Sequence, residues 1–470
     1  MSSGELPLDK YHRAQALGSG SYGSVVAVYN DDGEEFALKL FPTSEGSDYG
    51  NNSSSSSNNA DIVGLDLGAL REISILRLLR DENMHENIVP MCDVNCGIWD
   101  DIGDLGAGTG DCLGLTMPLY HCGTLGSAID GGSIVTKNQK VEIAHGILAG
   151  VAYLHDNGII HRDIKADNVM LSQNASGSFT PVLIDFSLAK VVTKTMFCNE
   201  IQTYASEMEQ ETGFTHTGEV GTVTYTAPEV LERRPYGLKS DLWSVGVLLL
   251  ELLKNHTLAA EKNKEAAREI ARGLKSLPNQ PFPNLIRGLL TVDPLRRLSA
   301  REALVSPAFE KFGLKVTPVR IINIDTALPL NETLIPPVDE NLPPNVGAAK
   351  NGKETTNAIL QKRKSRIIRV CQELGCSNPM TAFAATVYCS QLFQVDDTLD
   401  NYDRDSLPQG LLDCVVLATK FYELEVPDIT ALVGQGSFVH WSLQDYLEAE
   451  STIFMLMDFC LLSRFPMQPS

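Results

Sequence analysis

The chain has 470 residues, 43% of them hydrophobic, and its 59 acidic and 38 basic side chains give a formal net charge of -21. This length exceeds what a single hydrophobic core usually supports, so two or three domains are predicted. Because nucleic acids and anionic membranes carry the same sign of charge, a general affinity for either is not expected.

Residues 1–10 lack the apolar stretch of a secretory signal peptide, so no such leader is expected. The longest apolar runs, 245–253 and 453–462, are about ten residues long, too short to span a bilayer. The ten cysteines form no paired C-x-x-C sets, which predicts reduced thiols and a cytoplasmic or nuclear location. Two interpretations stay open for three of them, a metal site or small buried residues: Cys92, Cys96 and Cys112.

The first motif is the glycine-rich segment 18–25, GSGSYGSV. It leads into two predicted strands, 25–29 and 35–40, which are joined by the turn 30–33. The glycines therefore belong to a flap between strands, whereas in a dinucleotide-binding fold the same spacing opens a helix.

The chemistry of this flap suits a nucleotide triphosphate. Gly18, Gly20 and Gly23 allow backbone amides to come close to phosphate oxygens. Lys39, which ends Ala37-Leu38-Lys39, is expected to neutralise the α and β phosphates. The alternative for the motif alone is a glycine-rich hairpin with an exposed lysine.

Segment 48–60 is rich in Asn and Ser and is predicted to be a disordered loop tip without chemistry. The following segment 70–79 has the apolar spacing of a helix, with four residues on one face: Leu70, Ile73, Leu76 and Leu79. Glu72 interrupts the apolar pattern, and its predicted partner is Lys39. A solvated surface glutamate is the alternative for Glu72.

The segment 161–168, HRDIKADN, combines the groups that phosphoryl transfer needs. Asp163 is expected to accept or orient the proton of the substrate hydroxyl, and Lys165 to stabilise the transferring phosphoryl group. Asn168 is predicted to hold one magnesium ion. Paired strands at 169–171 and 182–184 bring the chain back, so that Asp185 lies near Asn168 and chelates magnesium on the phosphates.

Three cations from different parts of the chain are predicted to converge on one anion: Arg71, Arg162 and Lys190. The candidate anion is Thr217 in phosphorylated form, which would order its loop through charge-assisted hydrogen bonds. Three unrelated surface cations are the alternative. Two structural roles are also predicted: a buried ion pair of Glu229 with Arg297, and a cap by Asp241 on amides of the catalytic loop.

From 313 to 357 the composition shifts to Pro, Asn and acidic residues without periodicity, which predicts an extended linker. Successive amphipathic helices are predicted after it, from about residue 362 to 462. Segment 362–366, KRKSR, is either a nuclear signal or the solvated start of a helix.

Taken together, these motifs make residues 11–312 resemble a protein kinase, and Lys165 after the H-R-D marks the serine/threonine type. The resemblance implies an α+β bilobal fold, with a mostly β N-lobe over about 11–118 and a mostly α C-lobe over about 123–312. It also implies ATP and Mg²⁺ as cofactors and protein hydroxyls as acceptors. The residues it assigns to ATP binding are Leu17, Gly18, Gly20, Gly23, Val25, Ala37, Lys39, Glu72, Met117, Pro118, Tyr120 and Met170.

Within kinases, segment 69–76, ALREISIL, is similar to the A-I-R-E-I-S-L-L of the cyclin-dependent kinases. Counted back from Ala227-Pro228-Glu229, Thr217 falls at that family's activating threonine. Ser21 and Tyr22 match its inhibitory phosphorylation pair.

Segments 414–423 and 447–453 resemble a cyclin box, which implies an all-α cyclin-like domain over 358–465. Lys420 and Glu450 are then the pair that grips the kinase near its helix C. The implied partner is this domain itself, acting in cis, or a cognate protein. An unrelated helical bundle is the alternative.

Two departures from the family pattern carry information. Ser187 stands where the family has glycine, and Asp185 before it is retained. Segment 221–226, GTVTYT, replaces V-T-L-W-Y-R and lacks the arginine of the proline-accepting pocket, so phosphorylation is not expected to be strictly proline-directed.

The chain could also be a nucleotide-binding pseudokinase, or a scaffold whose helical domain recruits partners.

Overall fold

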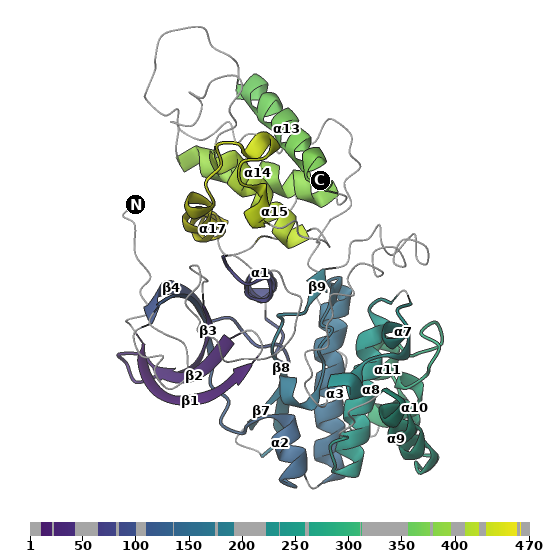
Figure 1. The fold of residues 1–470 in the computed structure, drawn as a ribbon. Coiled ribbons are helices and arrows are strands. Elements are labelled where there is room, and N and C mark those ends of the chain that lie inside the picture. The colour runs from purple at the N-terminus through teal and green to yellow at the C-terminus, as the bar shows by residue number, and fades with distance from the viewer. Residues whose placement is uncertain are drawn as a thin grey trace, which may run out of the picture. The chain divides into compact units, whose positions relative to one another are not determined.

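The computed structural model describes residues 11–20, 23–42, 64–80, 84–99, 110–134, 136–173, 177–191, 222–234, 236–258, 263–310, 312, 356–376, 379–395, 409–422, 429–457 and 461. The chain divides into two compact units, residues 1–59 with 65–323 and residues 60–64 with 324–470. Figure 1 shows a mixed first unit and an all-helical second unit. The short segment 60–64 groups with the helical unit, although it lies within the sequence range predicted for the first domain.

A five-stranded antiparallel sheet opens the first unit, in the order β1-β2-β3-β5-β4. Its strands are β1 (His12–Gly20), β2 (Gly23–Tyr29), β3 (Glu35–Pro42), β4 (Asp93–Trp99) and β5 (Gly110–Pro118). The predicted turn at 30–33 joins β2 to β3, with Gly33 at a φ of 79°, a conformation that glycine adopts without strain. Alternate residues of these strands, such as Val26, Val28 and Leu38, fill one face of the sheet.

Helix α1 (Leu67–Arg80) is the only long helix that the described chain places between the strands of this sheet. Asp66 begins it, because its Oδ1 accepts a hydrogen bond of 3.1 Å from the Ala69 amide. The predicted apolar face is buried: Leu70, Ile73, Leu76 and Leu79. Glu72 is also completely buried, so the acidic interruption in the pattern lies in the interior rather than in solvent.

The remainder of the first unit is mainly helical, with short strand pairs β6–β9 and β7–β8. Its helices are α2 (Leu125–Asp130), α3 (Lys137–Asp156), η2 (Ala166–Asn168), α6 (Thr222–Tyr225), α7 (Pro228–Leu231), α8 (Lys239–Lys254), α9 (Asn263–Lys275), α10 (Pro281–Leu289), α11 (Ala300–Leu304) and α12 (Pro307–Glu310). Its short strands are β6 (Ile159–Ile160), β7 (Val169–Gln173), β8 (Phe179–Leu183) and β9 (Lys190–Val191). The β-rich first part and helical second part agree with the predicted kinase architecture.

Two long helices, α3 and α8, form the centre of this helical part (Figure 1). Thr136 and Gln139 form a capping box that fixes the start of α3. Asn255 ends α8 in the left-handed conformation, and Lys140 of α3 donates to its Oδ1 at 2.6 Å. This hydrogen bond connects the start of α3 to the end of α8.

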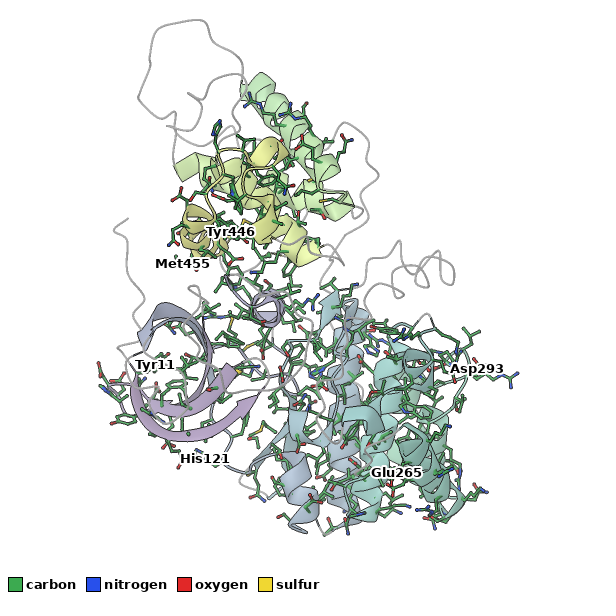
Figure 2. All side chains as sticks on the ribbon, in the orientation of Figure 1. Tyr11, His121, Glu265, Asp293, Tyr446 and Met455 are labelled. Carbon is green, nitrogen blue, oxygen red and sulfur yellow. The ribbon has the colours of Figure 1, made fainter. Side chains whose placement is uncertain are left out.

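The helical unit contains α13 (Thr356–Glu373), α14 (Pro379–Val395), α15 (Gln409–Tyr422), α16 (Ile429–Leu432), η5 (Gly436–Phe438) and α17 (Leu443–Leu456). Its interior side chains include Tyr446, whereas Met455 is 44% exposed (Figure 2). Inside the unit, Lys420 of α15 donates to Glu450 of α17 at 2.8 Å, and both side chains are almost fully buried. Among the described helices, none is both long and apolar enough to cross a membrane.

The sequence left open whether cysteines hold a metal. Cys92 is half-buried, and the side chains of Cys96 and Cys112 lie outside the described residues. Within the described part of the chain, no group of three or more His, Cys, Asp or Glu residues is arranged to hold a metal ion.

Asp413 of α15 is a second acid inside the helical unit, 2% exposed. Its Oδ1 accepts hydrogen bonds of 2.8 Å from Trp441 and from Gln409. Burial, assisted by the charge of Asp445 and opposed by these two donors, raises the pKa of Asp413 to about 7. The folded unit therefore prefers this group protonated.

This buried acid predicts a stability that depends on pH. Because the folded-state pKa lies above the unfolded value, the stabilising contribution is complete below that unfolded value and is lost as pH rises through about 7. Between about pH 5 and pH 7 the free energy of unfolding of the helical unit should fall by on the order of 2 kcal/mol. Asp413→Asn keeps a side-chain acceptor and should flatten this slope. Amide hydrogen exchange in α15, corrected for intrinsic rates, measures it; equal slopes in both proteins would show that another group titrates.

Candidate active site

Lys39 is the centre of the site. It lies on β3, and its Nζ donates to Glu72 Oε2 of α1 at 2.7 Å and to Asp185 Oδ1 at 3.1 Å. Burial alone would lower the pKa of Lys39, but attraction to the two carboxylates outweighs it and raises the pKa. Lys39 therefore carries its charge throughout the physiological range, although it is only 8% exposed.

The loop 161–168 gathers three of the predicted catalytic side chains. Asn168 donates through Nδ2 to Asp163 Oδ2 at 2.7 Å and to the Asp163 carbonyl at 2.8 Å. Lys165 Nζ lies 3.1 Å from the same Asp163 Oδ2. The cation and the amide thus hold the Asp163 carboxylate in one orientation.

Asp241, at the start of α8, fixes the backbone of this loop. Its carboxylate accepts from the amides of His161 and Arg162, each at 2.9 Å. Arg162 has a φ of 67°, a strained conformation for a residue with a side chain, and the paired amide bonds stabilise it. Asp241 therefore has the capping role that the sequence predicted.

The segment 185–187, DFS, follows β8 and is held by contacts on both sides. Phe186 is fully buried against the ring of His161, with centroids 4.9 Å apart. The Phe186 amide donates to Glu72 Oε1 at 3.3 Å. Glu72 thus bonds both Lys39 and the backbone next to Asp185, so α1 and this segment are positioned by one carboxylate.

The donor set fits a magnesium ion. The amide nitrogen of Asn168 is used by Asp163, and Asn168 Oδ1 accepts no hydrogen bond from the described residues. Asp185 accepts through Oδ1, and its Oδ2 likewise has no donor there. A carboxylate oxygen and an amide oxygen are the hard ligands that Mg²⁺ takes in proteins. Asn168 and Asp185 are therefore suited to hold the ion.

The strands place the predicted ATP-binding residues on neighbouring positions. In the sheet register, Gly18 pairs with Val25, Val25 with Lys39, and Ala37 with Met117. Gly20 and Gly23 pair at the turn end of β1 and β2. A Cβ built on Gly18 has no atom of the described residues within 4 Å, so these residues leave space over this strand.

The other predicted nucleotide contacts lie on β1, at and just after the end of β5, and on β7. Leu17 is on β1 and is 42% exposed. Pro118 ends β5, and Tyr120 follows it and is half-buried. Met170 of β7 bridges to Thr124 at the start of α2.

Comparison with known proteins decides the family. A protein kinase domain model matches residues 11–309, which is well over half of the chain. The chain belongs to the protein kinase family. Several of its curated relatives are named as serine/threonine-protein kinases.

Three relatives illustrate the similarity. The probable serine/threonine-protein kinase KCC4 of Saccharomyces cerevisiae is 29% identical over 63% of this chain and 26% of its own length. The serine/threonine-protein kinase GIN4 of the same yeast is 28% identical over 70% of this chain and 26% of its own length. The SNF1-related protein kinase catalytic subunit alpha KIN12 of Arabidopsis thaliana is 27% identical over 70% of this chain and 57% of its own length. The aligned part covers between about a quarter and little over half of these relatives.

The predicted regulatory residues of the kinase domain are only partly described. Ser21, Tyr22 and Thr217 lie outside the described residues. Arg162 Nε donates to the Leu188 carbonyl at 2.6 Å. Lys190 pairs with Ile160 between β6 and β9.

Arg71, the third predicted cation, is half-buried on α1. Thr217, the residue on which the three cations are predicted to converge, lies outside the described residues. Their convergence therefore stays a prediction.

Glu229 and Arg297 form the predicted ion pair. The guanidinium donates to both carboxylate oxygens, at 2.6 and 2.8 Å, and both residues are 1% exposed. This bidentate geometry anchors α7 to the loop before α11.

Three hydrogen bonds of this site were not predicted from the sequence. Tyr225 donates to Glu251 Oε2 at 2.6 Å, and the Ala166 amide of the catalytic loop donates to Tyr225 at 3.5 Å. Burial is the main cause that raises the pKa of Glu251 to about 7. An acid in the middle of the apolar segment 242–252 was the available signal, the same signal that identified Glu72. The third joins His155 to Asp241, with the ring nitrogen 2.9 Å from Asp241 Oδ2.

The ion pair of Lys39 with Glu72 predicts the effect of removing one charge. Glu72→Gln leaves Lys39 with Asp185 alone, so the lysine should turn away from the position that faces the phosphates. We expect kcat/KM for ATP to fall by roughly 10²-fold, measured by steady-state phosphate transfer. Glu265→Gln on α9, an exposed helix acid (Figure 2), is the matched control and should leave kcat/KM unchanged. Equal values for the Glu72 variant and the wild type would contradict the assigned role.

Proposed function

We propose that this chain transfers the γ-phosphate of ATP to serine or threonine hydroxyls of proteins. The observation that carries the proposal is the double pairing of Lys39 Nζ, at 2.7 Å to Glu72 and 3.1 Å to Asp185. Kinase catalysis requires both the lysine–glutamate pair and the magnesium-binding aspartate in place. In this structure the Lys39 ammonium group contacts both carboxylates.

The catalytic loop supplies the remaining roles. Asp163 orients the acceptor hydroxyl and takes its proton, since its carboxylate is fixed by Lys165 and Asn168. Lys165 stabilises charge on the transferring group. Mg²⁺, when bound by Asn168 and Asp185, neutralises the charge of the phosphates and orients them.

We also propose that the helical unit acts as a cyclin-type activator of the kinase domain. The names of the three relatives mention no cyclin, so this part depends on residues of the chain itself. Segment 69–76 resembles the helix C of cyclin-dependent kinases, and segments 414–423 and 447–453 resemble a cyclin box. Lys420 and Glu450, the pair expected to grip the kinase near that helix, are buried and 2.8 Å apart.

Gly64 supports this role. It groups with the helical unit, has a φ of 88°, and lies so close to Glu450 that an added Cβ would collide with the carboxylate. The same Cβ would come within 3.3 Å of Leu447. Only two residues, Leu65 and Asp66, separate Gly64 from Leu67, where α1 begins. The helical unit is thus proposed to act on α1, and so on Glu72, through this short segment.

The proposed activation is intramolecular, with a cognate partner as the alternative. The sequence predicts a linker at 313–357, and a random-coil chain of about 45 residues has an r.m.s. span of roughly 35 to 40 Å and gives an effective concentration approaching mM. We further propose that the acceptor site is not strictly proline-directed, that phosphorylated Thr217 orders its loop, and that Ser21 and Tyr22 are inhibitory sites. A cytoplasmic or nuclear location is proposed with these. A pseudokinase, or a scaffold that recruits partners, is the alternative function.

Phosphate transfer is tested with Asp163→Asn. The variant keeps the shape of the side chain and removes the proton acceptor, so transfer of radiolabel from γ-labelled ATP to serine- and threonine-bearing peptides should fall by roughly 10³-fold or more. ATP binding, measured by calorimetry, should change little. Absence of transfer by the wild type under all metal conditions would favour the pseudokinase. Transfer by the variant at the wild-type rate would show that the label comes from a contaminating enzyme.

The role of the helical unit is tested with Gly64→Ala. The methyl group has no room beside Glu450, so the segment before α1 should be displaced and kcat should fall by about 10-fold or more. Gly177→Ala is the matched control, because Gly177 has a similar φ of 82° but nothing within 4 Å of its Cβ. If both variants lose the same activity, the effect is backbone strain, and the proposed action on α1 is wrong.

A further inference from the structure

Ser187 occupies a position where the kinase resemblance predicts glycine, and it is 2% exposed. Its Oγ donates to Asp185 Oδ1 at 2.7 Å. The Ser187 amide lies 3.4 Å from the same oxygen, in a long hydrogen bond. With Lys39 at 3.1 Å, three donors converge on Oδ1.

The two oxygens of Asp185 are therefore unequal. Oδ1 is fully used inside the protein, whereas Oδ2 has no donor among the described residues. The Asp185 side chain remains 28% exposed, so a ligand can reach it. A carboxylate that is fixed through one oxygen presents the other in a defined direction, which reduces the entropy that metal binding has to remove.

The backbone accepts serine at this position. The described non-glycine residues with positive φ include Asp185, at 63°, but not Ser187. A Cβ at position 187 therefore causes no strain in this conformation, and it removes conformations that glycine would sample. The strained residue is Asp185 itself, and the hydroxyl bond of Ser187 stabilises it in that conformation.

We propose that Ser187 is a positioning residue, which holds Asp185 through Oδ1 so that Oδ2 is oriented for Mg²⁺ before the nucleotide binds. This inference rests on the proposed function, because it takes Asp185 as the magnesium ligand. Compared with glycine, Ser187 thus restricts the backbone and fixes the Asp185 carboxylate in an orientation suited to bind Mg²⁺.

The test separates the hydroxyl from the backbone. Ser187→Ala removes only the hydroxyl, Ser187→Gly removes the backbone restriction as well, and Ser187→Thr keeps the hydroxyl. Calorimetry on the full chain measures ADP binding as a function of Mg²⁺ concentration, and ADP binding in EDTA. Ser240→Ala is the control, because Ser240 is also buried and donates its hydroxyl to a carbonyl, that of Gly237, at 2.8 Å.

We expect the half-saturating Mg²⁺ concentration to rise about 3- to 10-fold in Ser187→Ala and further in Ser187→Gly. Ser187→Thr and Ser240→Ala should match the wild type, and ADP binding in EDTA should be equal in all variants. An unchanged Mg²⁺ requirement in Ser187→Ala overturns the inference and leaves the proposed function intact. An equal loss of binding with and without metal also overturns it, because it shows a structural role. If the wild type itself shows no Mg²⁺-dependent ADP binding, the proposed function fails together with the inference.

Discussion

The buried ion pair between Lys39 and Glu72 is the interaction on which the site depends. Moving two charges out of water costs several kcal/mol each, and good geometry with further hydrogen bonds is needed to offset it. Here Lys39 has a second carboxylate, Asp185, and Glu72 has a second donor, the Phe186 amide. The pair therefore joins strand β3, helix α1 and segment 185–187, and a movement of α1 would disturb all three.

The same arrangement recurs at other buried charges of the chain. Arg297 meets both oxygens of Glu229, and Asp241 accepts two backbone amides of the catalytic loop. In the helical unit, Lys420 and Tyr446 both donate to Glu450 Oε1. The carboxylates of Glu229, Asp241 and Glu450 each accept at least two hydrogen bonds, which offsets the cost of burying their charge.

Much of the kinase site could be predicted because phosphate chemistry restricts residue type and order. Lys39, Asp163 and Asp185 stand in motifs whose spacing is set by the backbone that carries them. Glu72 was predictable for another reason, since an acid within an apolar helical pattern requires a buried partner. The alternating strands and the amphipathic pattern of α1 likewise come from local periodicity.

Other features could not be predicted, because they depend on contacts between distant segments or on the direction of a side chain. The bond between Tyr225 and Glu251 needs α6 packed on α8, which no local pattern reveals. The sequence showed that Ser187 departs from glycine, but only the structure shows its hydroxyl on Asp185. The assignment of residues 60–64 to the helical unit is of the same kind, because it arises from tertiary contacts.

We propose that one polypeptide carries both the phosphate-transfer site and the domain that activates it. The most direct measurement inserts a specific protease site into segment 313–355 and compares specific activity before and after cleavage over a dilution series. Intramolecular activation predicts that the intact chain keeps a constant specific activity on dilution, whereas the cleaved chain loses activity as its two parts separate. Equal activity of intact and cleaved protein at every dilution, in samples where sedimentation shows the parts to be separate, would contradict the claim.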